Sequence, residues 1–180
     1  GEILRIGVYV DNLQVVHSVA LDDAGRGPEG CAYNSFTDAL ARDWEVVDEG
    51  PMHDLLGIEV RYNPDGSITL HQEQYIAKMV ERFLPGGVPQ RVEKNTLPYG
   101  SRFLEHLANA LLGLEPPDPA LVKLFQELLG CLMYAATSSR PDIAYPVHKL
   151  CTCLQRPTPE LLAEALHVLS YLARHSAVGI

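Results

Sequence analysis

The spacing of apolar residues becomes helical throughout beyond a stretch rich in Pro and Gly that spans residues 84–100, LPGGVPQRVEKNTLPYG. Before this stretch, β-rich runs joined by short turns alternate with two helical patterns. Beyond it, the apolar residues keep helical spacing to the end of the chain. We therefore predict an α+β fold, with a mixed first half over residues 1–98 and an all-helical second half over residues 99–180.

The first half begins with a predicted β-hairpin. Two β-rich runs, residues 3–10 and 13–16, flank Asp11 and Asn12, which tolerate turn conformations. After a loop at 22–30, Ser35 with Asp38 three residues later is typical of a helix N-terminus, and Phe36 and Leu40 follow at helical spacing.

A second hairpin is the strongest local signal in the chain. The runs 55–62 and 67–71 are β-rich, and the residues between them, Asn63-Pro64-Asp65-Gly66, favour a tight turn. The amphipathic spacing of apolar residues over 73–83 then predicts a helix.

Four helices are predicted in the second half, each separated from the next by a break that contains Pro. They span residues 103–114, 120–137, 143–154 and 160–175. Thr158-Pro159 suits the start of the last one, with Thr as the N-cap and Pro at the first helical position.

The charge of the chain limits its partners. Lys and Arg number 14 against 23 Asp and Glu, for a formal net charge of −9. A free-standing nucleic-acid binder normally carries a basic patch, so any contact with a polynucleotide is expected to be local or shared with a more basic neighbour. No apolar run is long enough to predict a membrane span, and no leader is recognised, so we expect no membrane partner and no secretion.

The four cysteines, Cys31, Cys131, Cys151 and Cys153, are too few and too unevenly spread for a secreted disulfide framework. Cys151 and Cys153, with His148 nearby, raise the alternative of a zinc site. No second ligand pair follows, and residues two apart on a helix point to different sides. Buried free thiols are therefore the preferred interpretation.

Asp11 has two interpretations. It can be an ordinary turn residue, or a carboxylate that a rigid hairpin aims at a divalent metal ion, as in polymerase sites that hold Mg²⁺. The dipeptide by itself favours the turn.

Four residues at this turn, Tyr9-Val10-Asp11-Asn12, resemble the YVDD turn of reverse transcriptases, and the motifs that follow come in the order of a copia-type retrotransposon enzyme. The most specific of them is LGCLMYAATSSRPDIAY, which resembles the family's G.LmYl...RPDi.y run. The resemblance covers nearly the whole chain. It implies the C-terminal part of a polymerase palm in residues 1–98 and the thumb and connection in residues 99–180.

For the first half, the resemblance implies that Asp11 and Asn12 are catalytic residues that bind Mg²⁺ or Mn²⁺, and that Tyr9 contacts nucleic acid. Gly57 falls in the hairpin that corresponds to the primer grip, which holds the primer 3′ end. A strand Gly lets another backbone approach closely. Alternatively, Gly57 eases strand twist or a bulge.

For the second half, the resemblance implies a helix that lies in the minor groove of the template-primer duplex. Gln126, Gly130 and Tyr134 are spaced by four residues and share one helical face. A polar group, a Gly and an aromatic make a chemically sensible track for a duplex. In the alternative, Tyr134 lies in the core and Gly130 at a contact between helices.

Basic residues and the RPD motif complete the set of candidates. Arg140-Pro141-Asp142 is expected to open a helix, with Pro141 in its first turn and Asp142 near the positive end of the helix dipole. Scattered Lys and Arg, Arg140 among them, could contact phosphates, but most are expected to be solvated.

The chain departs from the family at two points. The family's upstream catalytic Asp and its fingers are not in this sequence, and Asn12 stands where the family has a second Asp. An amide oxygen can bind a metal ion but brings no negative charge. We therefore expect a polymerase fragment that is inactive by itself. The alternative is a non-catalytic, element-derived protein whose helical half binds nucleic acid or protein.

The resemblance also implies partners and a location. The expected partners are an RNA/DNA template-primer, dNTPs and the rest of the polyprotein, with palm and fingers upstream and ribonuclease H beginning near Gly179. The expected location is the cytoplasm, in a virus-like particle, or the nucleus.

Overall fold

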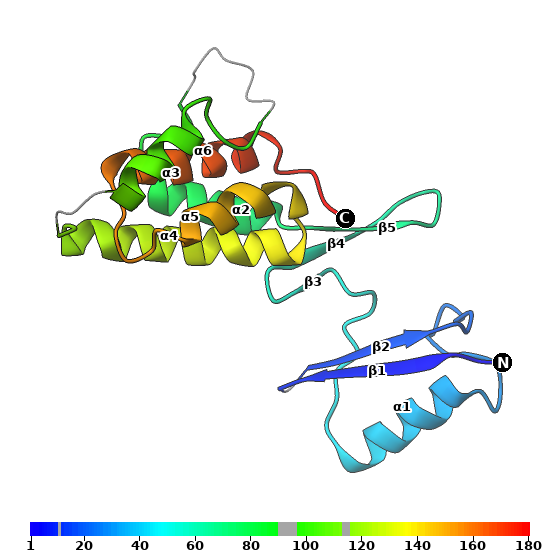
Figure 1. The fold of residues 1–180 in the computed structure, drawn as a ribbon. Coiled ribbons are helices and arrows are strands. Elements are labelled where there is room, and N and C mark those ends of the chain that lie inside the picture. The colour runs from blue at the N-terminus through cyan, green and yellow to red at the C-terminus, as the bar shows by residue number, and fades with distance from the viewer. Residues whose placement is uncertain (11, 90–96, 113–115) are drawn as a thin grey trace. The chain divides into compact units, whose positions relative to one another are not determined.

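The computed structural model describes residues 1–10, 12–89, 97–112 and 116–180 (Figure 1). The chain forms two compact units, Gly1–Met52 and His53–Ile180. Antiparallel sheets and helices are both present, so the predicted α+β class is confirmed. The assignment of residues 1–98 and 99–180 to a palm and a thumb is one of function and stays a prediction.

The first unit begins with the predicted hairpin. Strands β1 (Leu4–Tyr9) and β2 (Asn12–His17) pair antiparallel, with Tyr9 opposite Asn12 at the turn. Helix α1 (Ala32–Asp43) follows, and the imidazole of His17 packs on the ring of Tyr33 at 4.5 Å between centroids. The hairpin forms where the sequence predicts it, and the predicted helix is present.

The N-terminus of α1 lies earlier than predicted. The N-cap is Cys31, whose thiol accepts the Asn34 N–H, and not Ser35. The Ser35 hydroxyl is inside the helix and donates to the Cys31 carbonyl at 3.1 Å. Asp38 pairs with Arg26 instead of capping the helix. The prediction fails because a Ser followed by Asp three residues later also occurs inside helices, where other partners are available.

The second unit contains a three-stranded antiparallel sheet, β3 (Asp54–Leu55), β4 (Ile58–Tyr62) and β5 (Ile68–His71), in the order β3-β4-β5. The Asn63–Gly66 turn joins β4 to β5 as predicted. The expectation of one continuous strand over 55–62 is wrong, because the chain reverses at Leu56 and Gly57 and β3 pairs back on β4.

The end of the chain adds to this sheet. Leu70 of β5 and Ile180 exchange two backbone hydrogen bonds, of 2.8 and 3.0 Å. Gly179 allows the approach, because a Cβ there would lie 2.1 Å from the Leu70 carbonyl oxygen. The outer edge of β5 is therefore covered, at Leu70, by the chain's own C-terminal residues (Figure 1).

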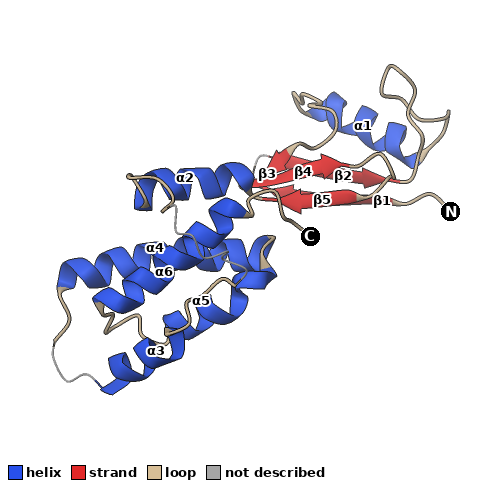
Figure 2. Cartoon of the chain, turned by 90° about the horizontal axis from the view of Figure 1, so that it is seen from above, coloured by secondary structure: helices blue, strands red, loops and turns tan. Residues whose placement is uncertain are grey.

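Helices make up the rest of the second unit, and Figure 2 shows them packed beside one another. They are α2 (Glu73–Phe83), α3 (Phe103–Leu112), α4 (Pro119–Ser138), the 3-10 turn η1 (Pro141–Ile143), α5 (Ala144–Cys151) and α6 (Pro159–Arg174). Their facing apolar side chains form one core, which includes the fully buried Phe125, Leu132, Val147 and Leu169.

Most predicted helices are confirmed to within one or two residues. Thr158 is the N-cap of α6 as expected, and its hydroxyl accepts the Leu161 N–H. The helix predicted over 143–154 is shorter, since α5 ends at Cys151 and the chain continues in turns. The predicted end of α3 at Leu114 lies outside the described residues.

Helix α4 is the one described helix that is long and apolar enough to cross a membrane, with 20 residues and a mean hydropathy of 1.2. One apolar face of this helix is buried in the core of the second unit. Its residues there include Phe125, Leu128, Leu129 and Leu132. A central helix of a packed domain has this same composition.

Candidate functional site

The candidate residues of the first unit lie at the end of the β1–β2 hairpin. Tyr9 and Asn12 are paired across the turn, and both are exposed to solvent. Val10, which precedes Asp11, has a φ of 54°. A β-branched residue in this left-handed region is rare and costs on the order of 1–3 kcal/mol, so the turn is held in an unusual shape. Asp11 lies outside the described residues.

The potential metal ligands in the described part of the first unit are not gathered into one group. Besides Asp11, the resemblance assigns only the amide of Asn12 to Mg²⁺ or Mn²⁺. No group of three His, Cys, Asp or Glu side chains that could hold a metal ion occurs among the described residues. Among the described residues, Asn12 is thus the one ligand that the resemblance assigns, and its amide brings no negative charge.

Gly57 lies in the tight turn between β3 and β4. Leu55 pairs with Ile58, so Leu56 and Gly57 form a two-residue loop, and both have positive φ, 55° and 79°. Such loops require left-handed conformations, which Gly adopts at little cost and Leu does not. A Cβ on Gly57 would meet only Tyr75 Cδ2, at 3.8 Å, which is an ordinary contact. Gly57 is therefore needed for its backbone conformation, and no described protein backbone approaches it closely. Its contact with a primer stays a prediction.

Helix α4 brings Tyr134 to this turn. The Tyr134 hydroxyl donates a hydrogen bond to the Leu56 carbonyl oxygen. Its ring meets the ring of Tyr75 from α2 edge to face, with centroids 5.2 Å apart and an angle of 77°. The Tyr75 hydroxyl in turn donates to the Cys131 carbonyl on α4 at 3.4 Å. Two tyrosines from different helices thus enclose one turn of the sheet.

Burial raises the pKa of the Tyr75 phenol well above its ordinary value of 10, and the neighbouring Cys131 acts in the same direction. A raised pKa keeps the phenol protonated at neutral and moderately alkaline pH. The Tyr75 hydroxyl therefore remains a hydrogen-bond donor to α4 over the physiological range.

Gln126, Gly130 and Tyr134 lie on one side of α4, as their spacing predicts. Gln126 is exposed, and its amide nitrogen donates to the Leu154 carbonyl at 3.2 Å. Gly130 is exposed, and apart from the backbone of its own helix no described atom lies within 4 Å of the place where its Cβ would be. Tyr134 is half-buried. Among the described residues Gly130 therefore makes no close contact with another helix, and Tyr134 lies half-buried against Tyr75 at the edge of the core.

Charged residues border this face. Lys123, exposed, precedes Gln126 by three residues and Gly130 by seven, so it belongs to the same side of α4. Glu127 forms an ion pair with Arg82 of α2. Sequence reasoning missed Lys123, although the same helical spacing that grouped Gln126 with Gly130 would have found it.

Arg140 does not belong to this face. Its guanidinium is fully buried and bonds both carboxylate oxygens of Asp142, at 3.0 and 2.8 Å, while Nη1 donates to the His175 carbonyl after α6 at 2.8 Å. Burial raises the pKa of Asp142, but the hydrogen bonds and charge of Arg140 outweigh this and hold the pKa below its ordinary value. Arg140 is therefore not available to phosphates, and the RPD motif joins η1 to the end of α6.

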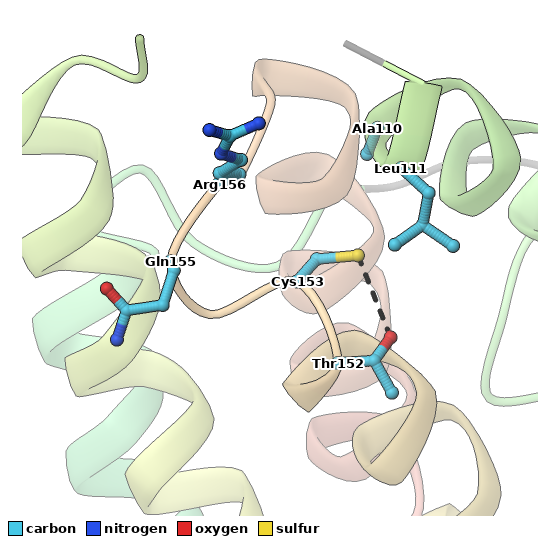
Figure 3. A pocket seen from close by; sticks show the side chains of 6 residues that line it. All are labelled: Ala110, Leu111, Thr152, Cys153, Gln155 and Arg156. Carbon is cyan, nitrogen blue, oxygen red and sulfur yellow. Dashed lines mark hydrogen bonds between the residues drawn. The ribbon is translucent and has the colours of Figure 1, made fainter. Parts of the chain in front are cut away.

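The Cys151–Cys153 segment packs as part of the core. Cys153 is buried and Cys151 half-buried, and burial raises the pKa of the Cys151 thiol. The Thr152 hydroxyl lies 3.7 Å from the Cys153 Sγ. Both residues line a pocket of about 140 Å³ (Figure 3). This pocket is lined by Ala110, Leu111, Thr152, Cys153, Gln155 and Arg156. Packing of Cys153 as a small apolar side chain agrees with the preferred interpretation.

The candidate residues thus form two groups, each within its own unit. Tyr9 and Asn12 face each other at the end of the β1–β2 hairpin. In the second unit the structure brings Gly57 and Tyr134 together at one turn, with Gly130 and Gln126 further along the exposed side of α4. Tyr75, which sequence reasoning missed, lies between the turn and α4. No local signal could have found it, because its contacts are far away in sequence.

Three relatives illustrate what the chain is similar to. The putative transposon Ty5-1 protein of Saccharomyces cerevisiae is 30% identical over 171 residues, 94% of this chain and 48% of that protein. The retrovirus-related Pol polyprotein from transposon RE1 of Arabidopsis thaliana is 28% identical over 174 residues, 96% of this chain and 10% of the polyprotein. The corresponding polyprotein from transposon TNT 1-94 of Nicotiana tabacum is 28% identical over 138 residues, 74% of this chain and 10% of that protein.

The chain therefore spans about half of the yeast protein and about a tenth of each plant polyprotein. No protein-family model matches the chain, and neither does any solved structure. The similarity to the Pol polyproteins runs through both compact units in the RE1 comparison, which covers nearly all of the chain. Over most of its length, and at modest identity, this chain is a homologue of the retrovirus-related Pol polyproteins of transposons.

Proposed function

We propose that this chain is part of the RNA-directed DNA polymerase of a copia-type retrotransposon, comprising the C-terminal part of the palm, the thumb and the connection. Its partners in the complete enzyme are an RNA/DNA template-primer, dNTPs and the flanking parts of the polyprotein. Homology to Pol polyproteins supports this proposal, as does the order of the motifs from Tyr9-Val10-Asp11-Asn12 to Arg140-Pro141-Asp142.

The exposed side of α4 is the proposed contact with the duplex, and Gly130 is the observation that carries it. A Gly inside a 20-residue helix costs about 1 kcal/mol relative to Ala. Nothing in the described structure explains this cost, since apart from the backbone of its own helix no described atom lies within 4 Å of the place for its Cβ. A bare helical backbone flanked by an amide and an aromatic ring suits the close approach of a duplex groove.

In the complete polymerase, the role of the first unit would be to present Asp11 and Asn12 to the metal ions, Mg²⁺ or Mn²⁺, that act at the primer 3′-hydroxyl. The strained φ of Val10 supports a functional turn, because unusual backbone conformations cluster at functional sites. The chain by itself is proposed to be inactive, since Asn12 stands where the family has a second Asp and brings no charge.

A segment-exchange experiment tests the catalytic part of this proposal. This chain replaces the homologous segment of an active copia-type polymerase, and extension of a primed RNA template is measured with Mg²⁺. We expect extension that is weak with Asn12 and stronger after Asn12→Asp, while Asp11→Ala abolishes it. The absence of product both with Asn12 and after Asn12→Asp would contradict a catalytic role.

A non-catalytic role is the second candidate, and Asn12 is the observation that favours it. In that case the second unit serves as a binding module for nucleic acid or protein. Titration of the chain with an RNA/DNA hybrid at low salt tests whether the ligand of this module is nucleic acid. Affinity that weakens in Gln126→Ala supports the duplex face of α4, and the absence of any affinity would remove nucleic acid as the ligand.

A further inference from the structure

The turn between β3 and β4 needs support from outside the sheet. Leu56 and Gly57 are both left-handed, and strand β3 contributes only two residues to pairing. The side chain of Leu56 is 51% exposed, so its own packing does not hold it in place. Backbone pairing over so short a strand does little to hold a strained turn in one conformation.

The support comes from two helices through two tyrosines. Tyr134 of α4 donates its hydroxyl to the Leu56 carbonyl. The ring of Tyr75 on α2 packs on Tyr134, and its hydroxyl reaches the backbone of α4 at Cys131. The same ring lies beside the turn, 3.8 Å from the place that a Cβ on Gly57 would occupy. Each tyrosine therefore connects the turn to α4, one directly and one through its neighbour.

The base of α2 is also fixed to the sheet. The Glu59 carboxylate of β4 accepts the Gln74 N–H at 2.9 Å, one residue before Tyr75. This hydrogen bond fixes the backbone next to Tyr75 to β4, the strand that follows the turn. Tyr75 sits between two attachments, Glu59 on the sheet and Cys131 on α4.

This arrangement sets the spacing between the turn and the exposed side of α4. Gly130 precedes Tyr134 by four residues, a rise of about 6 Å along the helix. The turn held by Tyr134 therefore lies about one helical turn beyond Gly130. Because the Tyr134 hydroxyl donates to Leu56, its hydrogen is not available to a ligand, and its ring remains as the group that a ligand can contact.

We propose that Tyr75 is a positioning residue, which fixes the Leu56–Gly57 turn relative to α4 so that the turn and the Gly130 face bind one RNA/DNA hybrid duplex together. The inference rests on the proposed function and adds to it a residue that acts through Tyr134 and the turn. The duplex then meets a preorganised surface, and little ordering of the turn opposes binding.

The test compares Tyr75→Ala with Tyr75→Phe, which keeps the ring. Tyr145→Ala is the matched control, because Tyr145 is a half-exposed helical tyrosine on α5 that packs on Tyr99. For each full-length variant we measure the affinity for a hybrid duplex at low salt, its salt dependence, the backbone order parameter of the Gly57 amide by NMR, and the urea midpoint of unfolding.

We expect Tyr75→Ala to weaken hybrid binding about tenfold and to lower the Gly57 order parameter from about 0.85 to below about 0.6. The salt dependence should not change, since the phosphate contacts remain. Tyr75→Phe should keep most of the affinity, and Tyr145→Ala should alter neither quantity. A rigid Gly57 in Tyr75→Ala, or equal loss of binding in Tyr145→Ala, would overturn the proposal.

A second variant keeps the test decisive if Tyr75→Ala unfolds. Tyr134→Phe removes only the hydroxyl that bonds Leu56, and it should mobilise Gly57 and weaken binding at an unchanged urea midpoint. An unchanged Gly57 amide in this variant would refute the positioning role. A different result would separate the two proposals: the wild type binds no hybrid, while Tyr75→Ala still mobilises Gly57. That result would refute the proposed duplex contact and the role of Tyr75 in binding, but it would establish that Tyr75 fixes the turn.

Discussion

At the scale of single residues, Gly130 is a position where helix stability and the proposed duplex contact favour different residues. Gly weakens a helix, and the open space around this one leaves room for a methyl group. Selection for stability alone would favour Ala at this position. The conflict between local propensity and the residue present is typical of positions that serve binding.

We predict that Gly130→Ala stabilises the chain by about 0.5–1 kcal/mol while weakening its affinity for an RNA/DNA hybrid. Urea unfolding followed by circular dichroism measures the first effect, and a fluorescence anisotropy titration measures the second. Ala108→Leu, on the exposed side of α3, adds bulk to another helix and serves as the control. Unweakened binding in Gly130→Ala would show that the duplex does not approach this residue.

Arg140 lies in a buried ion pair and not at a surface where it could contact phosphate. Its charge is balanced by Asp142, with the His175 carbonyl as a third acceptor. Because the pKa of Asp142 lies below its ordinary value of 3.8 in the fold, the pair contributes stability above that pH. The contribution is lost as pH falls from 3.8 through the lower folded value.

We predict that Asp142→Asn destabilises the chain by roughly 2–3 kcal/mol, somewhat less than for a fully buried pair because Asp142 is one-third exposed. Thermal unfolding near neutral pH tests this loss. The variant should also lose part of the decline in stability below about pH 4 that the wild type shows. If the stability of the variant declined with acid as much as that of the wild type, the Arg140–Asp142 ion pair would not be the cause of the decline.

At the scale of elements, local pattern predicted the helices well and the turns between strands less well. Helix α2 matches its prediction at both ends, because its apolar residues repeat at helical spacing. The reversal at Leu56 was missed because Leu rarely adopts positive φ, and only contacts from α2 and α4 hold it there. The Gln126, Gly130 and Tyr134 face was predictable from spacing within one helix, whereas Tyr75 and Arg140 act through partners distant in sequence.

The last residues of the chain pair with β5, which local pattern did not predict. We predict that Gly179→Ala releases them, because a methyl group would collide with the Leu70 carbonyl oxygen. The Leu70 amide, which donates to Ile180, should then exchange its hydrogen faster by at least about tenfold. Gly86→Ala, in open space after α2, is the control and should leave the Leu70 amide unchanged.

At the scale of the whole molecule, the two compact units differ in how much they bury. In the described part of Gly1–Met52, Cys31 and Tyr33 are the buried residues, while β1 and β2 expose Ile6, Val8 and Val16. The second unit contains the large apolar core. Since burial of apolar area is the main source of stability, the first unit should open more readily than the second.

We predict that amides of β1 and β2 exchange with solvent at least about a hundredfold faster than those of α4 and α6. Hydrogen exchange read by mass spectrometry of the full chain tests this. A hybrid duplex should protect peptides of α4 and the Leu56–Gly57 turn beyond this background. Equal protection of both units in the free chain would mean that the first unit gains stability from contacts other than its own core.

The pairing of Ile180 with Leu70 has a practical consequence for anyone who works with this protein. A purification tag or reporter attached after Ile180 starts directly at a sheet edge, beside a strand that begins at Ile68. A flexible, polar spacer would leave that edge closed, whereas an apolar, β-prone one could extend along β5 and promote association of molecules. The choice of the first few residues of such an extension would thus decide whether the preparation stays monodisperse.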